Sequence, residues 1–127
     1  MTTKQNALQA LLGANKDITK DVPVRRLGVN FIVKAIDSET LEGARAECTF
    51  GNGKGGKDVH EHKLGATLIA KSCVEPNFSD RALIEHYGAE DAADCVRKAL
   101  LAGEIAKLTE AVMDVSGFGE DEIDFPN

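Results

Sequence analysis

The feature that most constrains the fold of this chain is a run of four short apolar patterns with helical spacing between residues 68 and 119. In the last pattern, apolar residues recur at i, i+3, i+7 and i+10, which forms one stripe on an α-helix: Ile105, Leu108, Val112 and Val115. Short turn signals separate the patterns, at Glu75-Pro76, Gly88 and Ala102-Gly103. The run therefore predicts short helices packed around a shared core.

The helix boundaries follow from capping residues. Asp58 and Glu61 have the spacing of a capping box and predict a helix that runs to about Cys73. Ser79 or Asp80 is expected to cap a helix over residues 81–87, which Gly88 ends. A further helix is expected over about residues 90–101. After a bend at Ala102-Gly103, the last helix carries the stripe from Ile105 to Val115 and ends at Gly117.

The N-terminal third has strand character. Valines and a phenylalanine recur in residues 21–36 around a Leu27-Gly28 interruption, and Val29, Phe31 and Val33 alternate with polar residues. This pattern predicts a two-stranded β-hairpin in which Pro23 lies on the edge. A helix is expected to follow from Asp37 or Ser38 through Cys48.

Three further segments complete the predicted organisation. Residues 1–15 are expected to contain a short amphipathic helix that is mobile because it lies near a terminus. Residues 51–57 are predicted to be a flexible Gly-rich loop, and residues 119–127 an acidic tail. The fold class is α+β and mainly helical, with the whole chain, residues 1–127, as a single small domain and the hairpin near the N-terminal third.

Composition narrows the classes of partner. The chain has a net charge of −6, with nine Lys/Arg and six Asp/Glu in residues 1–57 and six and fifteen in residues 58–127. An acidic C-terminal half disfavours phosphate-backbone binding, and the absence of Trp with only one Tyr disfavours base stacking. We expect no nucleic-acid partner, and a surface charge that serves solubility or a basic protein partner.

Cysteine usage and the lack of long apolar runs indicate the compartment. The three cysteines are widely spaced and form no CxxC pair, which is typical of free thiols in a reducing cytoplasm. No apolar run reaches the length of a membrane span or of a signal-peptide core. The sequence therefore predicts a soluble cytoplasmic protein without a membrane partner.

One motif resembles a nucleotide-binding loop. Gly51 to Lys57 matches the first seven positions of the phosphate-binding P-loop, but Asp58 stands where a Ser or Thr would bind Mg²⁺. The parallel sheet that carries such a loop is also not predicted. A flexible, weakly basic loop is the favoured interpretation, and nucleotide binding is a remote alternative.

Metal binding and covalent catalysis are not favoured either. His60 and His62 are two residues apart on a predicted helix and so face apart, whereas helical ligand pairs need a spacing of three or four. Cys95 lies beside Asp91 and Asp94, which would raise the pKa of its thiol. We expect no metal, no cofactor and no enzymatic activity.

The bend before the last helix is the candidate partner-binding site. Leu100 and Leu101 point in adjacent directions, so both are hard to bury at once. Most of this apolar stripe is expected to be core, but one leucine is expected to line a groove that accepts a partner helix. The candidate partner-binding residues are Leu100, Leu101, Ile105 and Leu108.

The same region resembles a known family. The turn from Val74 to Phe78, the helix ending in Tyr87-Gly88, the bend from Leu100 to Glu104 and the Val115 to Phe118 step are similar to the C-terminal signature of the XkdN-like phage tail assembly chaperones. The resemblance covers about the last sixty residues well and the hairpin more loosely.

This resemblance implies a non-enzymatic, phage-encoded helper in the host bacterial cytoplasm. Such a protein would bind the tape measure protein, and the tail tube protein as a second partner, during tail assembly and would be absent from the finished virion. The alternative from another class is a structural tail or connector component that stays in the particle.

Overall fold

The computed structural model of the protein describes residues 6–14, 17–51, 57–59 and 61–118. In this part of the chain the fold is α+β and mainly helical, which confirms the predicted fold class. The helices are α1 (Ala7–Leu12), α2 (Ser38–Glu47), α3 (Glu61–Ser72), α4 (Arg81–Tyr87), α5 (Ala92–Ala99) and α6 (Ala102–Met113), which continues as the π-helical turn η1 (Asp114–Phe118). The strands are β1 (Thr19–Val24), β2 (Val29–Lys34), β3 (Thr49–Gly51), β4 (Lys57–Val59) and β5 (Cys73–Glu75).

The predicted hairpin is present but belongs to a larger sheet. Strands β1 and β2 pair antiparallel, and β5 adds on the other side of β2, giving the order β1-β2-β5. Strand β5 was not predicted, because three residues directly after a helix are too few to show strand alternation. Pro23 lies on the edge strand, as predicted, and its carbonyl accepts a hydrogen bond from Lys107 Nζ at 3.0 Å. That bond covers part of the open edge of the sheet.

Three capping residues of two helices, α2 and α4, agree with the prediction. The Asp37 carboxylate accepts a hydrogen bond from the Thr40 N–H at 2.9 Å, and α2 begins at the next residue. The Asp80 carboxylate caps α4 in the same way through Ala82. Gly88 ends α4 in the left-handed region, with φ of 62°.

The capping box predicted at Asp58 and Glu61 is wrong. Asp58 lies in strand β4, opposite Phe50 of β3, and α3 begins only at Glu61. The predicted loop 51–57 is thus bounded by two short paired strands, and its residues 52–56 lie outside the described residues. The acidic tail 119–127 also lies outside them.

The core has two parts that meet at α3. The larger part joins the inner face of the sheet to α3, α5 and α6, and includes Phe31 against Phe78 with ring centroids 6.1 Å apart. The smaller part lies between α2 and α3 and contains Ala44, Cys48, Leu64 and Leu68. Because α3 contacts helices on several sides, it is apolar around most of its circumference and shows only a weak amphipathic pattern.

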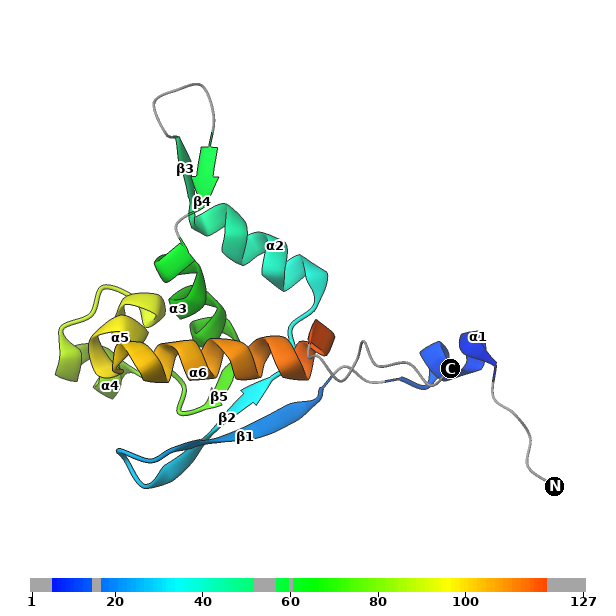
Figure 1. Cartoon of the computed structure of the whole chain (residues 1–127), viewed down its shortest axis with the longest axis horizontal. Helices are drawn as coiled ribbons and strands as arrows, with labels where there is room; N and C mark the ends of the chain where they lie inside the picture. Colours follow the sequence, from blue (N-terminus) through cyan, green and yellow to red (C-terminus); the bar gives the residue numbers. More distant parts are fainter. Residues whose placement is uncertain (1–5, 15–16, 52–56, 60, 119–127) are drawn as a thin grey trace.

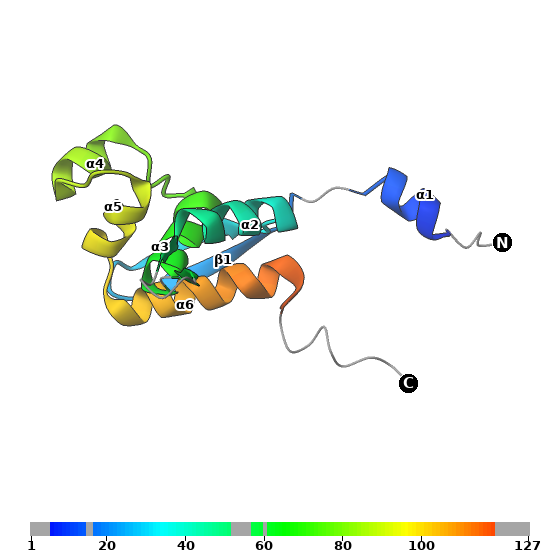
Figure 2. The same ribbon diagram turned by 90° about the horizontal axis from the view of Figure 1, so that it is seen from above.

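Different elements lie at the two ends of the molecule. The hairpin tip, α4, α5 and the start of α6 lie at one end, and α1 lies at the other, away from the body (Figure 1, Figure 2). The predicted helix at residues 7–12 is present, and none of its residues is buried. In the described residues, every helix is too short or too polar to span a lipid bilayer.

Candidate functional site

The four residues predicted to bind a partner do not form one surface. Leu100 is 7% exposed and Leu108 is 1% exposed, and both belong to the larger core. Ile105 is half-buried against that core, whereas Leu101 is 58% exposed. Leu100 and Leu108 are therefore unavailable to a partner in this conformation, and the candidate site must be built around Leu101.

The backbone at the bend explains this separation. Leu100 ends α5 and Leu101 precedes α6, and both have extended φ/ψ angles. Successive side chains of an extended backbone point in opposite directions. One leucine is therefore directed into the core and the next into solvent.

A side-chain clasp links this bend to the hairpin tip. The Arg26 guanidinium donates to both carboxylate oxygens of Glu104, at 2.8 and 2.9 Å, and to the Ala99 carbonyl at 3.2 Å. Glu104 Oε1 also accepts the Leu101 N–H at 2.8 Å, so this carboxylate caps the start of α6. Sequence reasoning missed the clasp because Arg26 and Glu104 are 78 positions apart.

The clasp shifts the pKa values of both of its residues. The hydrogen bonds from Arg26, together with that from the Leu101 N–H, lower the pKa of Glu104 to about 2. The same contact raises the pKa of Arg26 above its ordinary value. Both groups are therefore charged over the whole physiological pH range, so the clasp does not titrate within it.

Some of the exposed apolar residues lie at this end of the molecule, and others lie elsewhere, on α1 and at Ile18 and Phe118. Leu27 and Val29 lie at the hairpin tip, 47% and 54% exposed, and Arg26, the neighbour of Leu27, reaches residues on both sides of Leu101. We call Leu27, Val29 and Leu101 the tip surface. Its residues come from two elements that the clasp holds together.

A small groove lies beside the tip surface, between β1 and the start of α6. It has a volume of about 180 Å³ and is lined by Val22, Pro23, Val24, Arg25, Arg26, Gly103, Glu104, Lys107 and Leu108. Charged side chains of the hairpin turn and of the start of α6 line its sides. The buried Val22, Val24 and Leu108 form its apolar floor.

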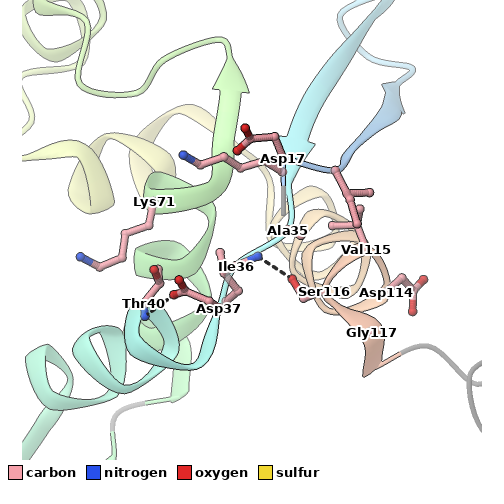
Figure 3. A pocket seen from close by; sticks show the side chains of 12 residues that line it. Asp17, Ala35, Ile36, Asp37, Thr40, Lys71, Asp114, Val115, Ser116 and Gly117 are labelled. Carbon is pink, nitrogen blue, oxygen red and sulfur yellow. Dashed lines mark hydrogen bonds between the residues drawn. The ribbon is translucent and has the colours of Figure 1, made fainter. Parts of the chain in front are cut away.

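A larger groove, of about 580 Å³, lies near the other end of the molecule (Figure 3). It lies where the end of β2, the start of α2 and η1 meet, and the Ile36 N–H donates to Ser116 Oγ across it at 2.9 Å. Gly117, with φ of 97°, allows the tight turn of η1 on its margin. Ile36 and Val115 pack against the core, whereas Ile18, which is 54% exposed, and several charged side chains form the rim of this groove.

The nucleotide-binding alternative lacks its structural context. In a P-loop, the Lys that follows the last Gly lies at the start of a helix whose N–H groups face the phosphates. Here Lys57 opens strand β4, and α3 begins four residues later. The described flanks of this segment therefore do not have P-loop geometry.

The cysteines and histidines form no site in the described residues. No group of three His, Cys, Asp or Glu side chains suited to a metal is found there, and His60 lies outside them. Burial raises the pKa of the Cys73 thiol to about 12 and raises that of Cys95. Neither thiol has the lowered pKa of a cysteine nucleophile.

Comparison with known proteins gives a consistent family match. The family described as phage XkdN-like tail assembly chaperone protein matches residues 8–125. A protein of Bacillus subtilis (strain 168) named uncharacterized protein YqbN is 31% identical over 98 residues, and the phage-like element PBSX protein XkdN of the same strain is 29% identical over 98 residues. Each match covers 73% of this chain and 66% of the relative, so the chain spans slightly less than two thirds of these relatives.

A solved structure shows the same fold. The crystal structure of the protein YqbN superposes with a TM-score of 0.68, at 21% identity, and the match covers 93% of this chain and all of that one. The arrangement of helices around the small sheet is therefore shared despite extensive change in sequence.

Proposed function

The chain belongs to the phage XkdN-like tail assembly chaperone family, and we propose that within tail assembly it binds apolar helical segments of the tape measure protein through the tip surface. Membership of the family supports the role in phage tail assembly. The identity of the partner and the surface it uses are the proposal.

The observation that supports this surface is the exposure of Leu101 beside the hydrogen-bonded clasp. Leu101 is 58% exposed although it follows directly on a core residue, and the clasp fixes both the start of α6 and the hairpin turn around it. Exposed apolar side chains on a rigid scaffold lose little conformational entropy on binding. A partner helix can therefore use Leu27 and Leu101 as neighbouring anchors.

A tape measure protein has the chemistry that such a surface accepts. Proteins of this kind are long helical chains whose apolar faces are exposed until tube subunits assemble around them. Many weak contacts with a small acidic chaperone would cover those faces and still dissociate when the tube displaces it. On this proposal the tail tube protein is a second partner, binding takes place in the host bacterial cytoplasm, and the chaperone is absent from the virion.

Co-purification of tagged chaperone with co-expressed tape measure protein tests the partner and the surface together. We expect the wild-type chain to retain the tape measure protein, and Leu27→Asp and Leu101→Asp to lose most of it, because a carboxylate replaces an apolar anchor. Phe118→Asp is the matched control: Phe118 is also 58% exposed but lies at the opposite end of the α6–η1 helix.

Each outcome of this experiment has one meaning. A wild-type chain that retains no tape measure protein would exclude the proposed partner. Equal retention by Leu101→Asp and wild type, with circular dichroism showing both folded, would exclude the proposed surface. Mass spectrometry of purified virions separates a chaperone, which should be missing, from a structural tail or connector component, which should be present in stoichiometric amount.

A further inference from the structure

We infer that the segment docking on the tip surface is an amphipathic helix whose apolar stripe is flanked by carboxylates. This inference rests on the proposed function and specifies the chemistry of the partner. It comes from the local charge at the tip, which is opposite in sign to that of the whole chain.

Three cations and one carboxylate line the groove beside the tip surface. The carboxylate, Glu104, is already paired with Arg26. In the described part of the chain, no carboxylate lies within ion-pair distance of Arg25, and Lys107 Nζ contacts only the Pro23 carbonyl. A protein of net charge −6 thus presents two cations without acidic partners next to its exposed leucines.

This local pattern reverses the expectation from the overall charge. Total charge predicts a basic partner, but screening in physiological salt limits the influence of exposed charges to about 8 Å. A docked helix would experience Arg25 and Lys107, because they line the groove next to the anchors. The nearest further carboxylates, Asp21, Glu110 and Asp114, line an adjoining groove that shares Lys107 and lies further from Leu101 along β1 and α6. Side chains flanking its apolar stripe would therefore be favoured as Asp or Glu.

The groove has room for such side chains. It opens between β1 and the first turn of α6, and a Cβ added at Gly103 would meet no atom within 4 Å. Gly103 lies in the same groove as Arg25 and Lys107. The backbone of Gly103 therefore leaves space in this groove for a side chain of a docked helix.

Two synthetic helical peptides, used with the full chain, test the inference. They share one leucine stripe and equal helicity by circular dichroism, and differ only in carrying Glu or Lys on the flanks. Fluorescence anisotropy should show the Glu-flanked peptide binding about tenfold more tightly at low salt, with the difference shrinking as salt is raised. Equal affinity, tighter binding of the Lys-flanked peptide, or binding of neither would overturn the inference.

Three variants locate the preference on the chaperone. Arg25→Glu should abolish or reverse the preference, and Gly103→Glu should do the same by placing a carboxylate in the groove. The second change also suits the first turn of α6, where acidic residues stabilise a helix, so folding is retained. Arg45→Glu makes the same charge change as Arg25→Glu on the exposed face of α2 and should leave the preference intact. A loss of preference in Arg45→Glu as large as in Arg25→Glu would show a long-range charge effect and contradict a local site.

The peptide experiment tests the inferred chemistry of the surface, and the co-purification experiment tests the proposed partner, so each can be contradicted without the other. If the tape measure protein is retained but the Glu-flanked peptide has no advantage, the inferred chemistry is wrong and the proposed function stands. If the peptide preference depends on Arg25 but the tape measure protein is not retained, the surface chemistry stands and the partner must be another acidic-flanked helix.

Discussion

At the scale of single residues, Glu104 has two structural roles. One oxygen accepts both the Leu101 N–H and an Arg26 N–H, and the other accepts the second Arg26 N–H. One side chain therefore caps α6 and ties the hairpin tip to the bend. The backbone of the exposed Leu101 is held by the same group, so a change at Glu104 should affect stability and, on the proposed function, binding as well.

The pH dependence of stability tests the clasp. Because the pKa of Glu104 is lowered from 4.5 to about 2 in the folded protein, its contribution is fully present above about pH 4.5 and is lost as the pH falls through about 2. We expect wild type to melt at a higher temperature than Glu104→Gln near neutral pH, and this difference to vanish by about pH 2. Thermal melts of both proteins across this range measure the difference directly. A constant offset at all pH values would mean that the ionised clasp contributes nothing.

At the scale of elements, the helix ends are where local sequence and structure agree best. Asp37, Asp80 and Gly88 each act within a few residues of their own position, so their roles are encoded locally. Asp58 shows the limit of such reasoning. Its spacing to Glu61 fits a capping box, but pairing with β3 places it in a strand, since tertiary pairing overrides a local preference.

A pair of glycine substitutions tests whether Gly88, after α4, is required for its left-handed backbone, with Gly103 at the start of α6 as the comparison. Gly88 has φ of 62° and open space around it, so Gly88→Ala should cost about 1–2 kcal/mol through backbone strain alone. Gly103 lies in the first turn of α6 without a positive φ, so Gly103→Ala should be neutral or stabilise by up to about 1 kcal/mol. Urea unfolding gives both free energies. Similar effects of the two changes would contradict the left-handed cap at Gly88.

At the scale of the whole molecule, the buried core and the exposed apolar side chains occupy different places. Residues of α3, α5, α6 and the inner sheet face form the core. Exposed large apolar side chains are found at the tip surface, on α1 and at Ile18, Val74, Tyr87 and Phe118. Helix α1 lies away from the body and contributes no buried residue (Figure 1). An isolated helix of six residues is far below the length that is stable in water. Since no residue of α1 is buried against the body, we expect α1 to contribute nothing to the stability of the domain.

Removing residues 1–14 should therefore leave the stability of the remaining chain unchanged, within about 0.5 kcal/mol. Leu108→Ala serves as the contrasting change, because Leu108 is 1% exposed and its truncation should cost about 2–5 kcal/mol. Chemical unfolding monitored by circular dichroism measures both. A destabilisation by the truncation comparable to that of Leu108→Ala would show that α1 packs on the core in solution.

Sequence by itself determined the mainly helical α+β class, the hairpin with Pro23 on its edge, the caps of α2 and α4, and the family, because each depends on spacing or chemistry within a short stretch of chain. It also identified the crowded bend at Leu100 and Leu101. Only the tertiary structure decided which leucine is exposed, that Cys73–Glu75 joins the sheet, and that Arg26 meets Glu104 across 78 positions. These outcomes depend on which distant surfaces meet when the core closes, and no local pattern in the chain records that.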